Sequence, residues 1–325
     1  MRKLVLIDGH AILYRAYHAF PKTLRTRRGE LVNAVYGFTR MLLKVVEDLS
    51  PACLAVAFDL PGPTFRHHAF VGYQAQRPKA DEEMINQIER VFEVVKTLNI
   101  PIFTADGFEA DDVMGTLAKQ AVPKKIKSQK SNLKTKMKKS KLEVIIVTGD
   151  KDIMQLVRRG VSVYSPVKGF SQAKLYRSKE VIDLLGVRPD QIIDYKALVG
   201  DPSDNYPGVP GVGPKTAEEL LGKYDDLETI YKNLEKIRPV VAKRLAEGKD
   251  SAYLSQELAK IVTNAPVKLS LKACRVHDYD HQKVKELFEK LEFKSLINKL
   301  PRVEKGKYQI EDKKEKSVEN QMKLL

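Results

Sequence analysis

The first half of the chain alternates short apolar runs with longer stretches of helical periodicity. Residues 3–7, 52–58 and 143–148 are short, apolar and rich in β-branched side chains, which is typical of strands buried on both faces of a parallel sheet. Between them, residues 33–49 and 81–98 repeat apolar side chains at the spacing of one helix face. We predict a helix for each of these two stretches.

Two weaker runs, at residues 101–103 and 161–164, add a third and a fifth strand to this pattern. The order of strands and helices predicts a doubly wound α/β core over residues 1–165. From about residue 175 the strand signal ends, and helical runs such as 189–199 and 216–221 take over. The predicted fold class is therefore α/β, with a parallel-sheet core followed by an all-helical domain.

Composition and net charge indicate what kind of partner this protein binds. The 325 residues are 43% hydrophobic and 30% charged, and 57 Lys and Arg against 42 Asp and Glu give a net charge of +15. A basic excess of this size is typical of nucleic-acid binding, although lysine-rich surfaces without such a partner exist. Cys53 and Cys274 are the only cysteines, which excludes a disulfide framework and a zinc cluster.

The ends of the chain and one internal stretch are polar. The N-terminus is charged too soon for a signal peptide, and no run approaches the ~18 apolar residues of a membrane span. We therefore expect a cytoplasmic protein without a membrane partner. Residues 123–141 contain nine lysines and no acid, which predicts a solvated insertion, either a basic tether for DNA or a plain loop expansion.

Acidic side chains follow the predicted strands, where each strand ends. In an open parallel sheet, functional groups gather beyond the carboxyl ends of the strands. A single Asp in such a place is often a helix cap or a turn former, but acids at four strand ends indicate a common site. The acids concerned are Asp8, Asp59, Glu109, Asp111, Asp112, Asp150 and Asp152.

Converging carboxylates repel one another unless cations neutralise them. Because this ligand set offers only oxygen, it suits Mg²⁺, or Mn²⁺ in its place, rather than zinc. Two such ions about 4 Å apart can activate a water and stabilise the leaving oxygen in phosphodiester hydrolysis. Asp201 and Asp204, spaced i and i+3 in the helical half, form an ordinary turn when taken alone and extend the acidic basin when taken together with the other acids.

A glycine-rich and proline-rich turn at residues 207–213 precedes a predicted helix that begins near Pro214. The turn and the helix N-terminus would present backbone N–H groups to a phosphate, and Lys215 would add charge. This pattern indicates a helix–hairpin–helix, which grips the DNA backbone without reading sequence. A plain corner between two helices is the alternative.

Basic and aromatic residues alternate over residues 65–79, between the second strand and the helix after it. This mixture suits a single strand, which offers phosphates together with bases that can stack. The candidates for DNA contact there are Arg66, Tyr73, Arg77 and Lys79, and residues 14–18 have the same character. His67 and His68 receive no predicted role.

Six segments occur in the order of the bacterial 5′–3′ exonuclease and flap endonuclease family. They read IDGHAILYRAYHAF, FD at residues 58–59, FRHHAFVGYQAQR, DGFEADDVMGTLA, TGDKD and VGDPSDNYPGVPGVGPKTA. Over about residues 1–290 the chain resembles this family, in particular the form found as the N-terminal nuclease domain of DNA polymerase I. The resemblance implies a PIN-like core that binds two or three divalent ions, a helical arch that admits the 5′ single strand, and a helix–hairpin–helix (H3TH) domain, often with a bound K⁺.

The resemblance also implies roles for individual residues. Asp8, Asp59, Glu109, Asp111, Asp112 and Asp150 resemble the first metal cluster and its surroundings, and Asp152, Asp201 and Asp204 resemble a second, less tightly held cluster. Arg77 resembles an arch arginine that clamps the scissile phosphate, and Tyr14 resembles an aromatic that stacks near the cleaved nucleotide. The hairpin residues are Gly208, Val209, Gly211 and Gly213.

These observations predict a PIN-like nuclease domain at residues 1–170, a helical DNA-binding domain at 171–295 and a flexible tail at 296–325. The expected activity is structure-specific 5′ cleavage of flaps, nicked or gapped duplex and RNA-primed ends, in primer removal and repair. We expect a monomer, either a stand-alone nuclease working beside a separate DNA polymerase or part of a longer polymerase. A non-catalytic DNA-structure-binding protein and a ribonuclease for single-stranded RNA are the alternatives.

Two departures from the family pattern stand out. The arch of the family usually reads Tyr-Lys, whereas Gln74 follows Tyr73 here. One positive contact to the substrate phosphate is thus missing, and we expect slower cleavage unless Lys79 substitutes for it. The lysine-rich segment 123–141 is the second departure, since it stands where a short turn is usual.

Overall fold

The structure is a computed structural model, and it describes residues 2–122, 142–168, 172–276 and 278–300. Its centre is a six-stranded sheet in the order β3-β2-β1-β4-β5-β6. All neighbouring strands run parallel except β5 and β6, which are antiparallel. The strands are β1 (Arg2–Asp8), β2 (Cys53–Ala57), β3 (Ile102–Phe103), β4 (Leu142–Val147), β5 (Val161–Lys168) and β6 (Gln172–Tyr176).

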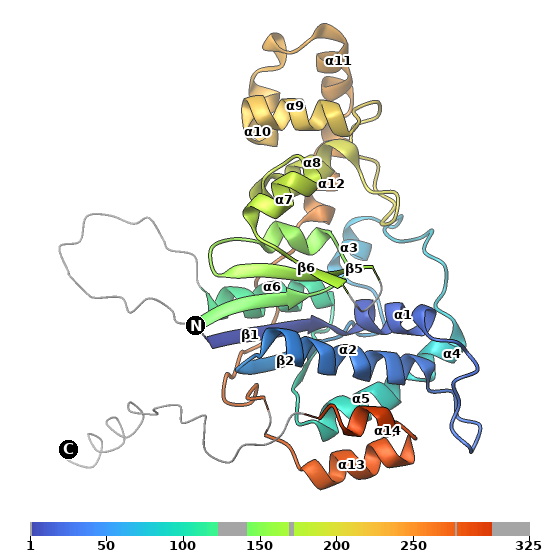
Figure 1. Ribbon diagram of the computed structural model, residues 1–325. Helices are drawn as coiled ribbons and strands as arrows, with labels where there is room; N and C mark the ends of the chain where they lie inside the picture. The colour runs from blue at the N-terminus through green and yellow to red at the C-terminus, as the bar shows by residue number, and fades with distance from the viewer. Residues whose placement is uncertain (1, 123–141, 169–171, 277, 301–325) are drawn as a thin grey trace, which may run out of the picture.

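Helices cover both faces of the sheet (Figure 1). Side chains alternate along a strand, so in β1 Leu4 and Leu6 join the core on one face, while Val5 and Ile7 join the core on the other. Helix α6 (Ala110–Ala121) packs on the first face. The second face is covered by α1 (Gly9–Ala19), α2 (Asn33–Leu49) and α5 (Ile88–Thr97).

Beyond β6 the chain is helical, and residues 178–259 form the upper part of the molecule in Figure 1. Helix α8 packs against both α12 and α9. The chain then returns, and α13 packs against α5 beside the sheet. The elements are α7 (Ser178–Leu185), η2 (Pro189–Gln191), α8 (Ile192–Val199), α9 (Pro214–Tyr224), α10 (Leu227–Lys232), η3 (Leu234–Lys236), α11 (Pro239–Glu247), α12 (Lys249–Ala259), α13 (His281–Lys290) and α14 (Lys294–Ile297).

The predicted strands and the alternation of strands and helices are confirmed, but the predicted domain limits differ from the structure. Strand β6 extends the sheet to Tyr176, beyond the limit set at residue 170. Val284, Phe288 and Leu296 are buried in the core beneath the sheet, so the last helices belong to the N-terminal layer. Residues 296–300 pack there as well, because Leu300 is buried, while the rest of the predicted tail lies outside the described residues.

Two further predictions need correction. The single helix predicted at residues 81–98 is two helices, α4 (Glu82–Ile85) and α5, because the side chain of Gln87 donates to Glu83 O (2.9 Å) and its backbone N–H bonds Met84 O (3.0 Å), three residues back. The predicted arch is helical only in α3 (Phe65–Ala69), and residues 70–80 form turns. Pro78 and the positive φ of Gln74 (55°) are incompatible with a continuous helix there. The lysine-rich insertion 123–141 lies outside the described residues.

A search of the described residues finds no helix with the length and apolar character that a membrane crossing requires.

The predicted glycine hairpin joins α8 to α9 and depends on close backbone packing. Gly208 has φ 62°, and a Cβ atom there would lie 2.2 Å from Gly200 N. Val209 N donates to Leu198 O (2.8 Å), which holds the hairpin against the end of α8. Gly213 has φ −98°, and a Cβ atom there would meet no heavy atom within 4 Å. Backbone packing therefore requires glycine at position 208 but not at position 213.

We expect Gly208→Ala to destabilise the protein by about 3 kcal/mol, because the added methyl clashes with backbone and the φ angle disfavours a side chain. Gly213→Ala is the matched control and should change the unfolding free energy by less than about 1 kcal/mol. Chemical denaturation followed by circular dichroism measures both. Equal stability of the two variants would contradict the packing described.

Candidate active site

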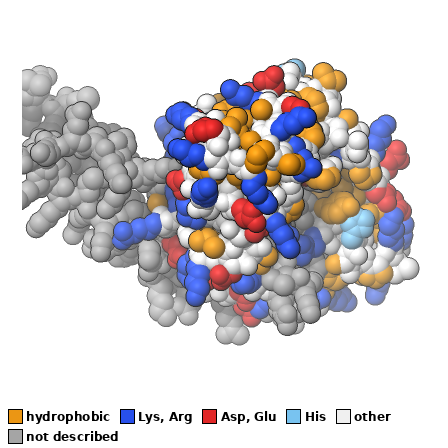
Figure 2. All heavy atoms as spheres, turned by 90° about the horizontal axis from the view of Figure 1, so that it is seen from above, with side chains coloured by type: hydrophobic (Ala, Val, Ile, Leu, Met, Phe, Trp, Pro, Cys, Tyr) orange, Lys and Arg blue, Asp and Glu red, His pale blue; other side chains and the backbone are white. Residues whose placement is uncertain are grey.

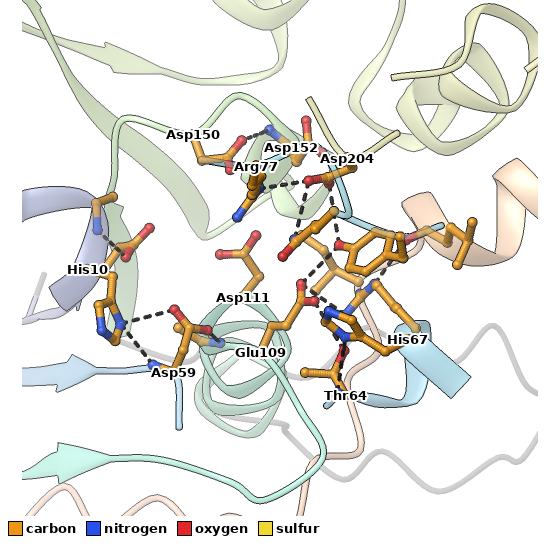
Figure 3. Close-up of a pocket in the computed structure, with 18 of the residues that line it drawn as sticks. His10, Asp59, Thr64, His67, Arg77, Glu109, Asp111, Asp150, Asp152 and Asp204 are labelled. Carbon is orange, nitrogen blue, oxygen red and sulfur yellow. Dashed lines mark hydrogen bonds and ion pairs between the residues drawn. The ribbon is translucent and has the colours of Figure 1, made fainter. Parts of the chain in front are cut away.

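All the acids predicted from strand ends except Asp112 line one cavity at the carboxyl edge of the sheet, together with Asp204. The cavity has a volume of about 490 Å³. Figure 3 shows its carboxylates converging from several elements, with Asp111 near the middle. The acids that line it are Asp8, Asp59, Glu109, Asp111, Asp150, Asp152 and Asp204.

Asp8 is fixed where β1 passes into α1. One of its oxygens accepts a hydrogen bond from Ala11 N (2.9 Å) as the N-cap of α1. The other accepts from Thr148 Oγ1 (2.7 Å) at the end of β4. The neighbouring strands β1 and β4 thus hold this carboxylate at the cavity edge, 6% exposed.

Asp59 and His10 face each other across the same edge. Asp59 Oδ1 accepts from Ala110 N (2.7 Å), and Oδ2 lies 3.0 Å from His10 Nδ1. Nδ1 also lies 3.1 Å from the backbone N–H of Asp59. Burial raises the pKa of Asp59, but His10, the backbone N–H of Ala110 and the charge of Arg77 together bring this pKa below its usual value. His10 therefore positions this carboxylate, a role that the sequence analysis did not assign.

The start of α6 supplies two more carboxylates. Glu109 is the N-cap residue, and Asp111 lies in the first helical turn, where the helix dipole favours negative charge. Glu109 Oε1 accepts from Thr64 Oγ1 (3.3 Å), and Oε2 pairs with Arg66 (3.2 Å). Asp111 has no hydrogen bond or ion pair among the described residues, and its carboxylate points into the cavity (Figure 3).

Asp112 differs from the acids that face the cavity. It is fully buried, with both oxygens bonded to Arg66 (2.8 and 3.0 Å), and it also accepts from Glu109 N and Val262 N. Such a saturated carboxylate has little capacity left for a metal ion. The prediction that Asp112 is a metal ligand does not fit this geometry, and Asp112 instead anchors the base of the arch.

Arg66 is likewise committed to the interior. Its guanidinium donates two hydrogen bonds to Asp112 and one each to the carbonyl oxygens of Leu258 and Lys260, and it also forms an ion pair with Glu109. It is 2% exposed, so the prediction that Arg66 contacts DNA is wrong. Sequence could not reveal this, because its partners lie more than 40 residues away.

Tyr73 is also buried, at 3% exposed, and its hydroxyl lies 3.3 Å from Glu109 Oε2 and 3.4 Å from Asp204 Oδ2. The prediction that it contacts DNA is therefore wrong too. Two other residues of the same loop attach the arch to Asp204 of the second acidic cluster. Arg77 Nη2 lies 2.7 Å and Gln74 Nε2 lies 3.2 Å from Asp204 Oδ1.

The second predicted cluster is present. One oxygen from each of Asp152, Asp201 and Asp204 lies within 4.8 Å of the other two. Lys196 on α8 pairs with Asp152 and, at 2.5 Å, with Asp201. The sequence analysis missed Lys196, although its position five residues before Asp201, in the predicted helical run 189–199, was visible.

The remaining predicted residues lie on the surface around the cavity. Tyr14 lines the cavity and is 56% exposed, as a stacking residue would be. Lys79 is exposed and is absent from the cavity wall. Lys215 is exposed in the first turn of α9, beside the hairpin residues Gly211 and Gly213. Seen from the helical end, Lys and Arg side chains are spread over the surface (Figure 2).

Burial and mutual repulsion make the acidic groups hard to ionise. Burial raises the pKa of Asp8 to about 6, with smaller contributions from Asp59 and Asp150. Burial raises the pKa of Glu109 to about 7 even though Arg66 opposes the shift. The pKa of Asp111 is raised well above its usual value by burial and by the charges of Asp150 and Asp8. A cation in the cavity would remove this unfavourable energy.

The donor set fits hard divalent ions. The acids offer carboxylate oxygens, and none of the cavity-lining residues is a cysteine. Asp8, Asp59, Glu109, Asp111 and Asp150 would hold a first ion, while Asp152, Asp201 and Asp204 would hold a second. The ammonium of Lys196 already stands between two acids of the second group, which shows that this group accepts a cation.

Comparison with known families assigns both halves of the chain. Residues 3–186 match the 5′–3′ exonuclease N-terminal resolvase-like domain, and residues 187–282 match the 5′–3′ exonuclease C-terminal SAM fold. The chain belongs to the 5′–3′ exonuclease family. The resemblance found from sequence motifs is therefore confirmed.

Relatives and solved structures agree with this family. The chain is 40% identical over 300 residues to DNA polymerase I of Caldicellulosiruptor bescii and 37% identical over 300 residues to that of Bacillus subtilis. Each match covers 92% of this chain but only 33% and 32% of the relative. The chain thus spans about a third of the length of these polymerases.

Solved structures show the same fold at low sequence identity. The bacteriophage T5 D15 flap endonuclease, in a pseudo-enzyme–product complex with DNA and metal ions, has a TM-score of 0.63 and 20% identity. The match covers 90% of this chain and all of the phage protein. The catalytic core of Rad2 in complex with DNA substrate has a TM-score of 0.53 and 16% identity, with 89% and 87% covered.

The raised pKa values predict an unusual pH dependence for the stability of the metal-free protein. The folded pKa of Asp8 lies above the unfolded pKa, so the folded state binds more protons and stability falls as pH rises from about 4 through about 6. Asp8 alone would contribute on the order of 3 kcal/mol. Thermal unfolding in EDTA at pH 5 and pH 7.5 measures this loss, which Mg²⁺ should reverse at pH 7.5.

Asp111→Asn removes one of the repelling charges, so we expect it to raise the thermal midpoint in EDTA at pH 7.5 and to reduce the response to Mg²⁺. Asp183→Asn is the control, since Asp183 is exposed on α7. It should leave both quantities unchanged. An Asp111→Asn midpoint below that of the natural chain would contradict the repulsion described.

Proposed function

We propose that this chain is a structure-specific 5′ nuclease that hydrolyses phosphodiester bonds of DNA in the presence of Mg²⁺. Its substrates would be 5′ flaps, nicked or gapped duplex and RNA-primed ends. The observation that carries the proposal is the convergence of seven acids on one cavity in a member of the 5′–3′ exonuclease family. The exposed Tyr14 and Arg77 at the same cavity support a nucleic-acid substrate.

Different residues would bind the metal ions, the scissile phosphate, a base and the duplex backbone. Divalent ions held by the carboxylates would activate a water and stabilise the leaving oxygen. Arg77, half-exposed on the arch, would contact the scissile phosphate once it leaves Asp204. Tyr14 would stack on a base at the cavity mouth. The exposed Gly211, Gly213 and Lys215 would hold the duplex backbone without regard to sequence, whereas the predicted contacts Gly208 and Val209 are buried in the hairpin.

The proposal also covers the location of the protein, its oligomeric state and its division into domains. We place the protein in the cytoplasm, in primer removal and DNA repair, acting as a monomer beside or within a DNA polymerase. We divide it into a PIN-like nuclease domain and a helical DNA-binding domain, with the chain crossing near residue 176. Whether the hairpin binds K⁺ stays a prediction, since Gly208 O and Gly211 O already accept hydrogen bonds from Ser251 and Arg244.

A labelled 5′-flap duplex tests the proposal. With Mg²⁺ or Mn²⁺ the protein should release short 5′ products, and Asp150→Asn should lower the single-turnover rate by about a thousandfold or more, because a metal-binding charge is lost. The amide can still accept the hydrogen bond that Asp152 N donates to Asp150 (2.8 Å). Flap affinity measured in Ca²⁺ should stay within about threefold. Absence of cleavage by the natural chain in both metals would refute the proposed activity.

The arch offers a second test. Gln74 lies in the cavity wall beside Arg77, so Gln74→Lys would add a positive charge where the substrate phosphate is expected. We expect the single-turnover rate to rise by about three- to tenfold. Gln76→Lys, on the exposed part of the same loop, is the control and should have a smaller effect. Equal rates for the two variants would show that the position of the charge does not matter.

A further inference from the structure

Lys196 is an internal cation within the second acidic cluster. It projects from α8, whose next two residues, Ala197 and Leu198, are fully buried and fix the helix in place. Its side chain is 14% exposed, and its ammonium pairs with both Asp152 and Asp201. Lysine is rarely buried to this extent without such partners.

The pairing leaves each acid of the cluster with a protein cation. Lys196 serves Asp152 and Asp201, while Arg77 lies 2.7 Å from Asp204. Three carboxylates this close would otherwise repel one another strongly. The metal-free cluster is therefore held together by side chains of the protein itself.

Tyr206, two residues after Asp204, provides a second observation. The hydroxyl of Tyr206 is buried and has no hydrogen-bond partner among the described residues. Tyr206 is tied to the cluster through its backbone, since its N–H donates to Asp201 O (3.1 Å) and its carbonyl oxygen accepts from Asp201 N (2.9 Å). An unpaired buried hydroxyl costs about 1–3 kcal/mol, so it indicates a position for a further polar partner beside the cluster.

We propose that Lys196 is a resident cation of the second cluster, and that a divalent ion binds there only by displacing its ammonium from Asp152 and Asp201. Asp201 Oδ1 already accepts hydrogen bonds from Ser203 N and Asp204 N, so an ion would have to use Oδ2, the oxygen that Lys196 pairs with. The two cations therefore compete. The flexible four-carbon stem of lysine allows the ammonium to withdraw without movement of α8. This inference rests on the metal dependence proposed above and adds a residue that lowers the metal affinity of the second cluster.

Binding of Mn²⁺ to the DNA-free protein tests the inference directly. In calorimetric and electron paramagnetic resonance titrations, we expect Lys196→Met to bind one Mn²⁺ at the second cluster at least about tenfold more tightly than the natural chain. Lys196→Arg keeps the charge and should reproduce the natural isotherm. Lys151→Met removes an exposed lysine between Asp150 and Asp152 and should change the affinity by less than about threefold, since exposed charges are screened.

Stability gives a second readout. Without Lys196 the three carboxylates lack their shared cation, so Lys196→Met should lower the thermal midpoint in EDTA and gain more from Mn²⁺ than the natural chain does. Should this variant fail to fold, Lys196→Gln keeps a hydrogen-bond donor without the charge, and the same tighter binding is expected of it.

The outcomes separate this inference from the proposed nuclease function. If the natural chain cleaves flaps and binds Mn²⁺, but the uncharged variants at position 196 give its unchanged isotherm, the role of Lys196 is refuted and the function stands. If the natural chain binds no Mn²⁺ and cleaves no flap, the metal-dependent function fails, and this inference fails with it.

Discussion

The bidentate ion pair between Arg66 and Asp112 holds together three segments that lie far apart in the sequence. Arg66 belongs to α3 at the base of the arch, Asp112 to the first turn of α6, and the carbonyl oxygens of Leu258 and Lys260 to the end of α12. Removing one partner of a buried pair typically costs about 3–5 kcal/mol. The arch, the acidic helix and the helical domain therefore keep a common geometry through one guanidinium.

In the cavity beside this pair, the carboxylates lie where their ionised forms are electrostatically unfavourable. Burial and mutual repulsion raise the pKa values of Asp8, Glu109 and Asp111, and Asp111 has no partner among the described residues. The sheet and the helix N-termini hold the carboxylates in place, because Asp8 and Asp59 each accept a backbone N–H. Such a site stores unfavourable energy that divalent cations would release.

The two acidic clusters differ in how far protein cations neutralise the repulsion between their carboxylates. The first is left with few protein cations near its cavity-facing acids, whereas the second is neutralised by Lys196 and Arg77. Both cations lie on elements that also serve DNA contact in the proposed function, α8 leading into the hairpin and the arch. The charge of the second cluster is thereby connected to the parts of the molecule that would meet the substrate.

Sequence by itself determined the parallel sheet, the position of acids at its carboxyl edge and the glycine hairpin. Strand alternation, strand ends and turn residues are local properties, so they can be read without knowing which segments meet. The acids of the cavity followed from the rule that strand ends share one edge, and their all-oxygen chemistry followed from their residue types.

Only the tertiary structure decided which basic and aromatic residues stay exposed. Arg66 and Tyr73 have the composition of a DNA-binding loop, yet both are buried, because their partners Asp112, Glu109 and Asp204 come from distant segments. Lys196 meets Asp152 across 44 positions for the same reason. Charge can be counted along a sequence, but its solvation and its partners exist only after folding, and these decide whether a cation binds DNA, fixes the fold or occupies a metal position.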